Sequence, residues 1–174
     1  GSTSLTSRGV QDAFVMHVTS SGAIDWAIQV GGTSDDRGCG IAHDGAGGAL
    51  VTGYFSGEAS FGSTSFTSRG MQDAFVMHVA ASGAIDWAIQ AGGTSYDRGY
   101  GIAHDGAGGA LVTGYFRGDA SFGSQTLTTS QTAATCFVAS LTIGVVPVVP
   151  DGECDGDACD DSPPDLPPLP RGAP

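Results

Sequence analysis

The sequence contains no lysine, and its six arginines are outnumbered by eighteen acidic residues, which gives a formal net charge of −12 at pH 7. A chain this acidic repels the phosphate backbone of DNA and RNA, so we expect no nucleic-acid partner. The sequence also lacks any run near the ~20 apolar residues that a membrane-spanning helix needs. We therefore expect no membrane span.

Proline is absent before residue 147, and all eight prolines lie at or beyond Pro147. This shift in composition divides the chain into residues 1–144, which are rich in Gly, Ser, Thr, Ala and Val, and residues 145–174, which are rich in Pro and Asp. Such a Pro-rich acidic segment favours an extended chain without a packed core. We expect a disordered tail at 145–174.

The sequence also lacks the 3.6-residue apolar period, the caps and the length that indicate a helix. It repeats itself instead. A shift of 61 positions lays residues 1–61 over 62–122 with nine differences, among them Asp35/Tyr96 and Cys39/Tyr100, and a partial third copy occupies 123–144. Repetition at a fixed period indicates stacked units that cannot bury their apolar faces alone.

Turn signals divide each copy about every 8–12 residues, a spacing typical of short antiparallel strands. Apolar side chains alternate in "DAFVMHV" and "AIDWAIQV", which predicts two half-buried strands. The short segments "CGIAHD" and "ALVTGYF" flank an Asp-Gly hairpin signal, "DGAGG". Each unit is thus predicted to hold four strands, with a long loop and one short strand at 56–72.

The motif "DAFV…GAIDWAIQVGGTSDDRGCGIAHDGAGGALVTGYF" resembles the bacterial SBBP family of β-propeller repeats over about residues 10–143. The resemblance implies an all-β, β-propeller-like array of four-stranded antiparallel blades, about two blades plus partial ones, from a fragment of a larger propeller. It also implies a secreted or cell-surface bacterial protein. It does not imply an enzyme, because the family is defined by its scaffold.

Propeller order places "CGIAHD" nearest the axis, followed outward by "ALVTGYF", "DAFVMHV" and the Trp strand. One complete blade then spans 39–91, while 10–30 supply the outer two strands of a preceding blade and 100–143 the inner three strands of a following one. Closed propellers typically have about 4–8 blades. Because an end blade buries only one face, we expect further blades in cis or self-association.

The loops that join a rim strand to the next inner strand carry the candidate ligand-binding residues Asp36, Arg37, Asp97 and Arg98. A repeated Asp-Arg pair at the mouth of a central channel could contact a sugar, a peptide or a cation. The alternative is that the aspartate caps the turn and the arginine pairs with it or with the neighbouring blade as part of the scaffold.

No catalytic residues are predicted. His43 and His104 precede Asp44 and Asp105, but adjacent strand residues point to opposite faces, so neither pair forms a ready dyad. Ser, His and Asp are abundant, yet the sequence has no nucleophile elbow, zincin helix or phosphate-binding loop.

The acidic tail contains two further candidate features. Cys154 and Cys159 could close a small disulfide loop, in keeping with an oxidising exterior. Alternating acids resemble the front half of an EF-hand-like loop, but its twelfth position is Ser162, so we expect at most weak calcium binding and no other cofactor. The alternative is a solvated acidic linker. The calcium candidates are Asp151, Glu153, Asp155 and Asp157.

These observations predict a non-enzymatic repeat scaffold that presents a binding or adhesion surface to a protein or carbohydrate ligand, outside the cell or at its surface. Two alternatives stay open. The near-identity of the copies also suits a passive structural spacer, and a propeller hydrolase or lyase could hold its active groups in missing blades.

Overall fold

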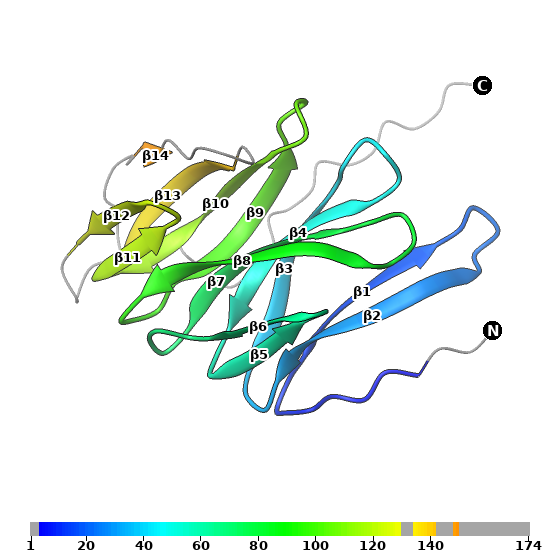
Figure 1. Cartoon of the computed structure of the whole chain (residues 1–174), viewed down its shortest axis with the longest axis horizontal. Helices are drawn as coiled ribbons and strands as arrows, with labels where there is room; N and C mark the ends of the chain where they lie inside the picture. The colour runs from blue at the N-terminus through cyan, green and yellow to red at the C-terminus, as the bar shows by residue number, and fades with distance from the viewer. Residues whose placement is uncertain (1–3, 130–133, 142–147, 150–174) are drawn as a thin grey trace, which may run out of the picture.

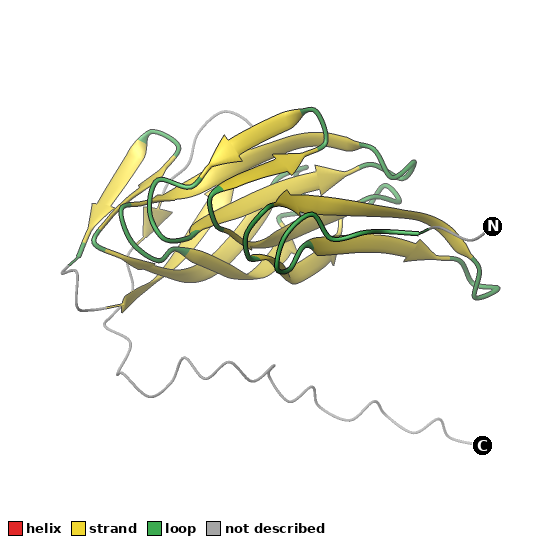
Figure 2. Ribbon diagram, turned by 90° about the horizontal axis from the view of Figure 1, so that it is seen from below, coloured by secondary structure: helices red, strands yellow, loops and turns green. Residues whose placement is uncertain are grey.

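The computed structural model describes residues 4–129, 134–141 and 148–149. Every element of regular secondary structure among them is a β-strand, and the strands form three antiparallel sheets that lie side by side (Figure 1). Seen at right angles, the described part shows only strands and loops (Figure 2). The fold is therefore all-β and propeller-like, as the sequence predicts, and its sheets form an open array.

The middle sheet contains the complete blade that the repeat predicts. Its strands are ordered β12-β11-β8-β7-β4-β3, so the inner-to-outer order of the four blade strands is confirmed. We call β3, β4, β7 and β8 the middle blade. The bounds are β3 (Asp36–His43), β4 (Ala49–Phe55), β7 (Asp73–Val79), β8 (Ile85–Gly93), β11 (Asp119–Phe122) and β12 (Gln125–Thr128).

On either side of the middle blade, the described strands form part of a further blade. The first blade has the two outer strands β1 (Ala13–Val18) and β2 (Ile24–Gly32), in a sheet ordered β1-β2-β5-β6. The third blade has the inner strands β9 (Arg98–His104), β10 (Ala110–Arg117) and β13 (Ala134–Leu141), in a sheet ordered β14-β13-β10-β9. Strand β14 is Val148–Val149. The rest of the predicted tail lies outside the described residues, and its disorder stays a prediction.

The segment after β4 differs from expectation. It forms a hairpin of two strands, β5 (Glu58–Phe61) and β6 (Thr64–Thr67), which joins β2 through two residue pairs, Gly31↔Ser60 and Gly32↔Ala59. Gly32 is required there, because a Cβ on it would lie 1.7 Å from the Glu58 carbonyl oxygen. The hairpin β11–β12 extends the middle blade in the same way.

Alternate side chains of β7 enter two different cores. Phe75 and Met77 are fully buried in a cluster with Val15 of the first blade, whereas Val76 is buried in a second cluster with Phe137 of the third blade. The period of two along a strand therefore places β7 between two apolar interfaces. The blades are stacked face to face, which is the relation that the repeat predicts.

Aromatic side chains from the hairpins complete both interfaces. The Phe61 ring lies 4.9 Å from that of Phe75, and the Phe122 ring lies 4.6 Å from that of Phe137, measured between ring centroids. Burying one such side chain fully contributes about 1.5–3 kcal/mol. The hairpins thus stabilise the contact between blades as well as extending the sheets.

Candidate functional site

The two predicted aspartates are turned into the protein. Asp36 Oδ2 accepts a hydrogen bond from the Gly32 amide at 2.7 Å and Oδ1 accepts one from the Ser56 amide at 3.2 Å. Asp97 accepts the equivalent bonds from the amides of Gly93 and Arg117, at 2.7 and 3.2 Å. Each carboxylate therefore ties the end of one rim strand to the strand that begins the next blade.

Burial sets the electrostatics of these aspartates. Both are almost fully buried. Desolvation raises the pKa of Asp97 to about 6 and raises that of Asp36, against the opposing effect of the amide donors. A carboxylate so enclosed is suited to holding the turn, and a ligand has no direct access to it.

The two predicted arginines both lie close to the ring of one tyrosine, Tyr54. The guanidinium carbon of Arg98 lies 4.5 Å from the ring centroid of Tyr54, and that of Arg37 lies 5.9 Å from the same ring. Their Nε groups donate to the side chains of Gln72 and Gln11, at 2.6 and 2.7 Å. The structure thus brings Arg37 and Arg98 together across the boundary between the middle and third blades.

Further tyrosines surround Arg98. Its guanidinium carbon lies 5.7 Å from the Tyr115 ring and 5.9 Å from the Tyr96 ring, and its Nη1 donates to the Tyr100 hydroxyl at 3.3 Å. Cation–π contacts of this kind contribute about 0.5–2 kcal/mol each, depending on desolvation. We call the following residues the arginine–tyrosine cluster: Arg37, Tyr54, Tyr96, Arg98, Tyr100 and Tyr115.

The cluster has two buried tyrosines beneath side chains that reach solvent. Tyr54 and Tyr115 are buried, and burial raises the pKa of both phenols, so they are neutral at physiological pH. Arg37 and Tyr100 are exposed and Arg98 is half-buried. Guanidinium N–H groups and phenol hydroxyls beside aromatic rings can bind carboxylates, hydroxyl-rich ligands or peptide groups.

Sequence reasoning found the arginines of this cluster and missed its tyrosines. A signal was present: Tyr96 and Tyr100 are two of the nine positions at which the copies differ, and they flank Arg98 at two residues on either side. The first copy has Asp35 and Cys39 instead, so only the second copy can build the ring of tyrosines.

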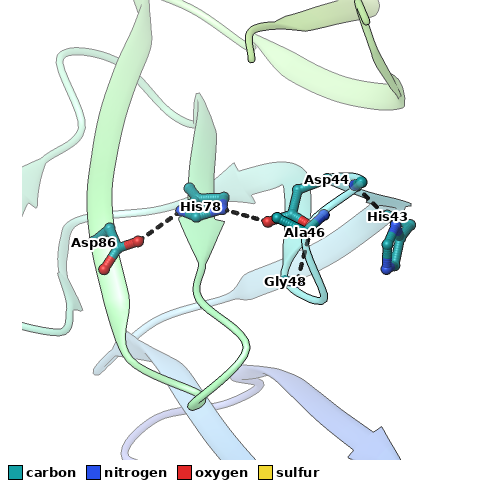
Figure 3. Close-up of polar contacts among 7 residues, drawn as sticks. His43, Asp44, Ala46, Gly48, His78 and Asp86 are labelled. Atoms are coloured by element: carbon teal, nitrogen blue, oxygen red, sulfur yellow. Dashed lines mark hydrogen bonds and ion pairs between the residues drawn. The ribbon is translucent and has the colours of Figure 1, made fainter.

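A second polar group joins a histidine to two aspartates. His78 Nε2 lies 2.9 Å from Asp44 Oδ2, and His78 Nδ1 lies 2.9 Å from Asp86 Oδ2 (Figure 3). Asp44 also accepts hydrogen bonds from the amides of Ala46 and Gly48, and His43 points away from His78. The hydrogen bond from His78 is the largest cause that lowers the pKa of Asp44 to about 2.

This group connects strands rather than offering a free base. Each ring nitrogen of His78 faces a carboxylate oxygen at 2.9 Å, so neither nitrogen is turned toward solvent or a ligand site. The His78 ring also stacks on Trp87, with 5.8 Å between centroids. His78 therefore links β7, β8 and the β3–β4 hairpin. In the first blade, the His17 ring likewise lies 5.8 Å from that of Trp26, and Asp25, at 3.2 Å, is its one aspartate contact among the described residues.

The metal and disulfide candidates of the tail, Asp151, Glu153, Asp155, Asp157, Cys154 and Cys159, lie outside the described residues. Within the described ranges, no group of three or more His, Cys, Asp or Glu side chains is arranged to hold a metal ion. Cys136 on β13 is disulfide-bonded. The part of the chain with described structure also contains no helix long and apolar enough to cross a membrane.

Comparison with known proteins connects this geometry to a repeat family. Residues 86–115, which run from near the start of β8 to near the end of β10, match the family model SBBP, described as a beta-propeller repeat. No curated protein matches the chain. The match covers the rim strand of one blade and the two inner strands of the next, including Arg98, Tyr96, Tyr100 and Tyr115 but not Tyr54. Residues 86–115 are therefore similar to a β-propeller repeat of the SBBP family, the family that the sequence pattern resembles.

Proposed function

We propose that this repeat scaffold is non-enzymatic and presents a binding or adhesion surface on a secreted or cell-surface bacterial protein. The surface is the arginine–tyrosine cluster, and its ligand is a protein or a carbohydrate. The proposed function needs no cofactor, because the cluster offers hydrogen-bond donors and aromatic faces as its binding groups.

The observation that carries this proposal is the asymmetry of the cluster. Two near-identical copies differ at nine positions, and two of these differences place Tyr96 and Tyr100 beside Arg98. Tyrosine and arginine are the residue types enriched at the energetic centres of protein interfaces. A scaffold alone does not require these tyrosines, since the first copy forms the same turn with Asp35 and Cys39.

The disulfide at Cys136 supports the proposed location. Stable disulfides form in oxidising compartments and are rare in the bacterial cytosol. A net charge of −12 also keeps an exported chain soluble and away from anionic partners.

The test is a screen of glycan and protein arrays with the chain of residues 1–174 and three variants. Arg98→Gln and Tyr96→Asp alter the cluster, and Tyr96→Asp introduces the residue that the first copy already tolerates. Arg8→Gln removes the same charge from an exposed site outside the cluster. A ligand that uses the cluster should bind about tenfold more weakly to the first two variants and unchanged to the control.

A passive spacer is the second candidate, because the copies are otherwise so similar. If the chain is a spacer, we expect no binding on the glycan or protein array, or binding that Arg98→Gln and Tyr96→Asp leave unchanged. Either result would refute the binding surface. A positive screen of hydrolase or lyase substrates would instead refute the non-enzymatic part of the proposal.

A further inference from the structure

Two of the nine differences between the copies change the formal charge, and both fall near Arg98. Tyr96 stands where the first copy has Asp35, and Arg117 stands where the first copy has Ser56. The first exchange removes a negative charge and the second adds a positive one, while the other seven differences leave the charge unchanged. The surroundings of Arg98 are therefore more positive, by two charges, than the same region of the first copy.

Arg117 lies beside the arginine–tyrosine cluster. Its amide donates to Asp97, the residue before Arg98, at 3.2 Å. Burial raises the pKa of the Tyr115 phenol, and the positive charges of Arg98 and Arg117 act against that rise. The Arg117 Nε is buried and has no hydrogen-bond partner among the described residues. A third guanidinium, with a donor to spare, thus stands next to the cluster.

The guanidiniums of the cluster are not neutralised within the described part of the chain. Each ion pair found there involves a histidine and an aspartate. Arg98 and Arg37 instead donate Nε to the uncharged side chains of Gln72 and Gln11. A guanidinium held in this way still presents its Nη N–H groups, and such N–H groups match the two oxygens of a carboxylate.

Exposed apolar side chains lie next to the glutamines that hold the arginines. Met71 is 60% exposed and precedes Gln72, and Val10 is 75% exposed and precedes Gln11. The Met71 amide donates to the Ser95 carbonyl oxygen at 2.9 Å, which places Met71 beside the turn that leads into the cluster. Methionine, tyrosine and arginine are the residue types enriched where proteins meet.

The aromatic faces on which a sugar ring could stack are covered. Tyr54 and Tyr115 are buried, and the Arg98 guanidinium lies over the Tyr54 ring. Tyr100 is exposed, and its hydroxyl accepts a hydrogen bond from Arg98. The groups that the cluster offers to a partner are thus cationic donors with apolar side chains nearby, which fits a protein surface better than a neutral sugar.

The net charge of −12 restricts the kind of acid that can bind. An extended polyanion is repelled by the acidic residues spread over the chain. Exposed charges more than about 10 Å apart are largely screened at 0.1 M ionic strength, so a single carboxylate at the cluster responds mainly to the guanidiniums beside it. The ligand group is therefore an isolated acid within a larger partner.

We propose that the arginine–tyrosine cluster binds an aspartate or glutamate carboxylate presented by a partner protein. Arg98 and Arg37 supply the N–H donors, Arg117 adds positive charge, and Met71 supplies apolar contact. The inference rests on the proposed function, because it names the ligand chemistry of the same surface. It goes further by choosing a protein acid over a carbohydrate.

An array of hexapeptides tests the inference with the chain of residues 1–174. Each peptide that contains Asp or Glu is matched by one with Asn or Gln at the same place, and oligosaccharides of galacturonic acid and of galactose are printed beside them. Binding of each hit is then measured by fluorescence anisotropy from about 50 to 500 mM NaCl, because exposed ion pairs weaken as salt increases.

The variants separate charge from folding. Arg98→Gln removes one donor of the cluster. Tyr96→Asp combined with Arg117→Ser restores the residues of the first copy, which forms the same turn. Arg8→Gln is the control, because it removes a positive charge from an exposed position outside the cluster. Thermal melts confirm that each variant is folded.

We expect acidic peptides among the hits, with binding that weakens as salt increases. Replacing the acid of a hit by its amide, Arg98→Gln and the double variant should each weaken binding at least about tenfold, and Arg8→Gln should leave it unchanged. The inference is overturned if the amide versions bind equally well, if only the galacturonic acid oligosaccharides bind, or if the peptide array is silent.

These outcomes distinguish the inference from the proposed function. A neutral peptide or a glycan whose binding is lost in Arg98→Gln overturns the carboxylate ligand and supports the binding surface. If no peptide binds, the inference fails, and the glycan and protein arrays described above decide the proposed function separately.

Discussion

Phe14 and Phe75 offer the sharpest mutational comparison, because they occupy the same position of an identical heptapeptide in different surroundings. Phe75 is 0% exposed and its ring lies 4.9 Å from that of Phe61. Phe14 is 61% exposed on the open face of the first blade. Removing a buried phenylalanine costs about 3–5 kcal/mol, so Phe75→Ala should lower the free energy of unfolding by that amount. Phe14→Ala should lower the free energy of unfolding by about 1 kcal/mol, because folding removes less than half of this side chain from water.

The measurement is urea unfolding followed by the fluorescence of Trp26 and Trp87, at a chain concentration of about 1 μM so that association does not cover the open face. Phe75→Leu and Phe14→Leu form a milder pair in case Phe75→Ala does not fold. Equal losses at the two positions would refute the reasoning, since they would mean that both copies of the heptapeptide are equally enclosed.

Three further predictions concern packing and charge. Gly99→Ala should lower the melting temperature by several degrees, because the added Cβ would meet Thr52 of the preceding blade. Gly38→Ala should leave the melting temperature nearly unchanged, because its added Cβ would lie 3.7 Å from Ala13 Cβ, an ordinary contact. Equal shifts for the two variants would contradict the difference in packing between the two copies. The raised pKa of Asp97, about 6, means that the folded chain binds this proton more tightly than the unfolded chain does. Asp97 should therefore make the folded chain more stable as pH falls from 7 toward 4, by up to about 3 kcal/mol. In urea titrations at each pH, Asp97→Asn should remove this contribution and leave that of Asp36, whose pKa burial also raises. His78→Ala should raise the pKa of Asp44 from about 2 toward 3.8, measured by carboxyl NMR titration, and an unchanged value would show that the histidine does not hold that carboxylate.

The blade and its boundaries were predictable from the sequence because period and turn chemistry are both local signals. Alternation in "DAFVMHV" and the hairpin signal "DGAGG" fix the strands, and the 61-residue shift fixes which strands belong together. The complete blade was predicted at 39–91, and the structure has it from Asp36 to Gly93. The hairpin β5–β6 was not predicted, because its short strands are held to β2 by two residue pairs that depend on glycines 27 or more residues earlier.

The candidate site was less predictable, because a sequence gives the type of a side chain but not its direction. Asp36 and Asp97 are acidic residues in a Gly-rich loop, which suggests a ligand site, yet the amides of the folded turn enclose both carboxylates. The tyrosine at 54 could not be linked to Arg98 by spacing, since they are 44 positions apart and meet only when the blades stack. The differences between copies were the available signal.

The central claim is that β7 is enclosed between two blades, whereas β1, with the same sequence, lies at an edge of the described strands. Hydrogen exchange at β1 and β7 tests this claim most directly. The two heptapeptides have the same intrinsic exchange rates, and flanking residues make their proteolytic fragments distinguishable by mass. At about 1 μM, we expect strong protection throughout 73–79, and protection in 12–18 that is far weaker, with fast exchange at the amides facing the open edge. Equal protection of the two segments would contradict the account.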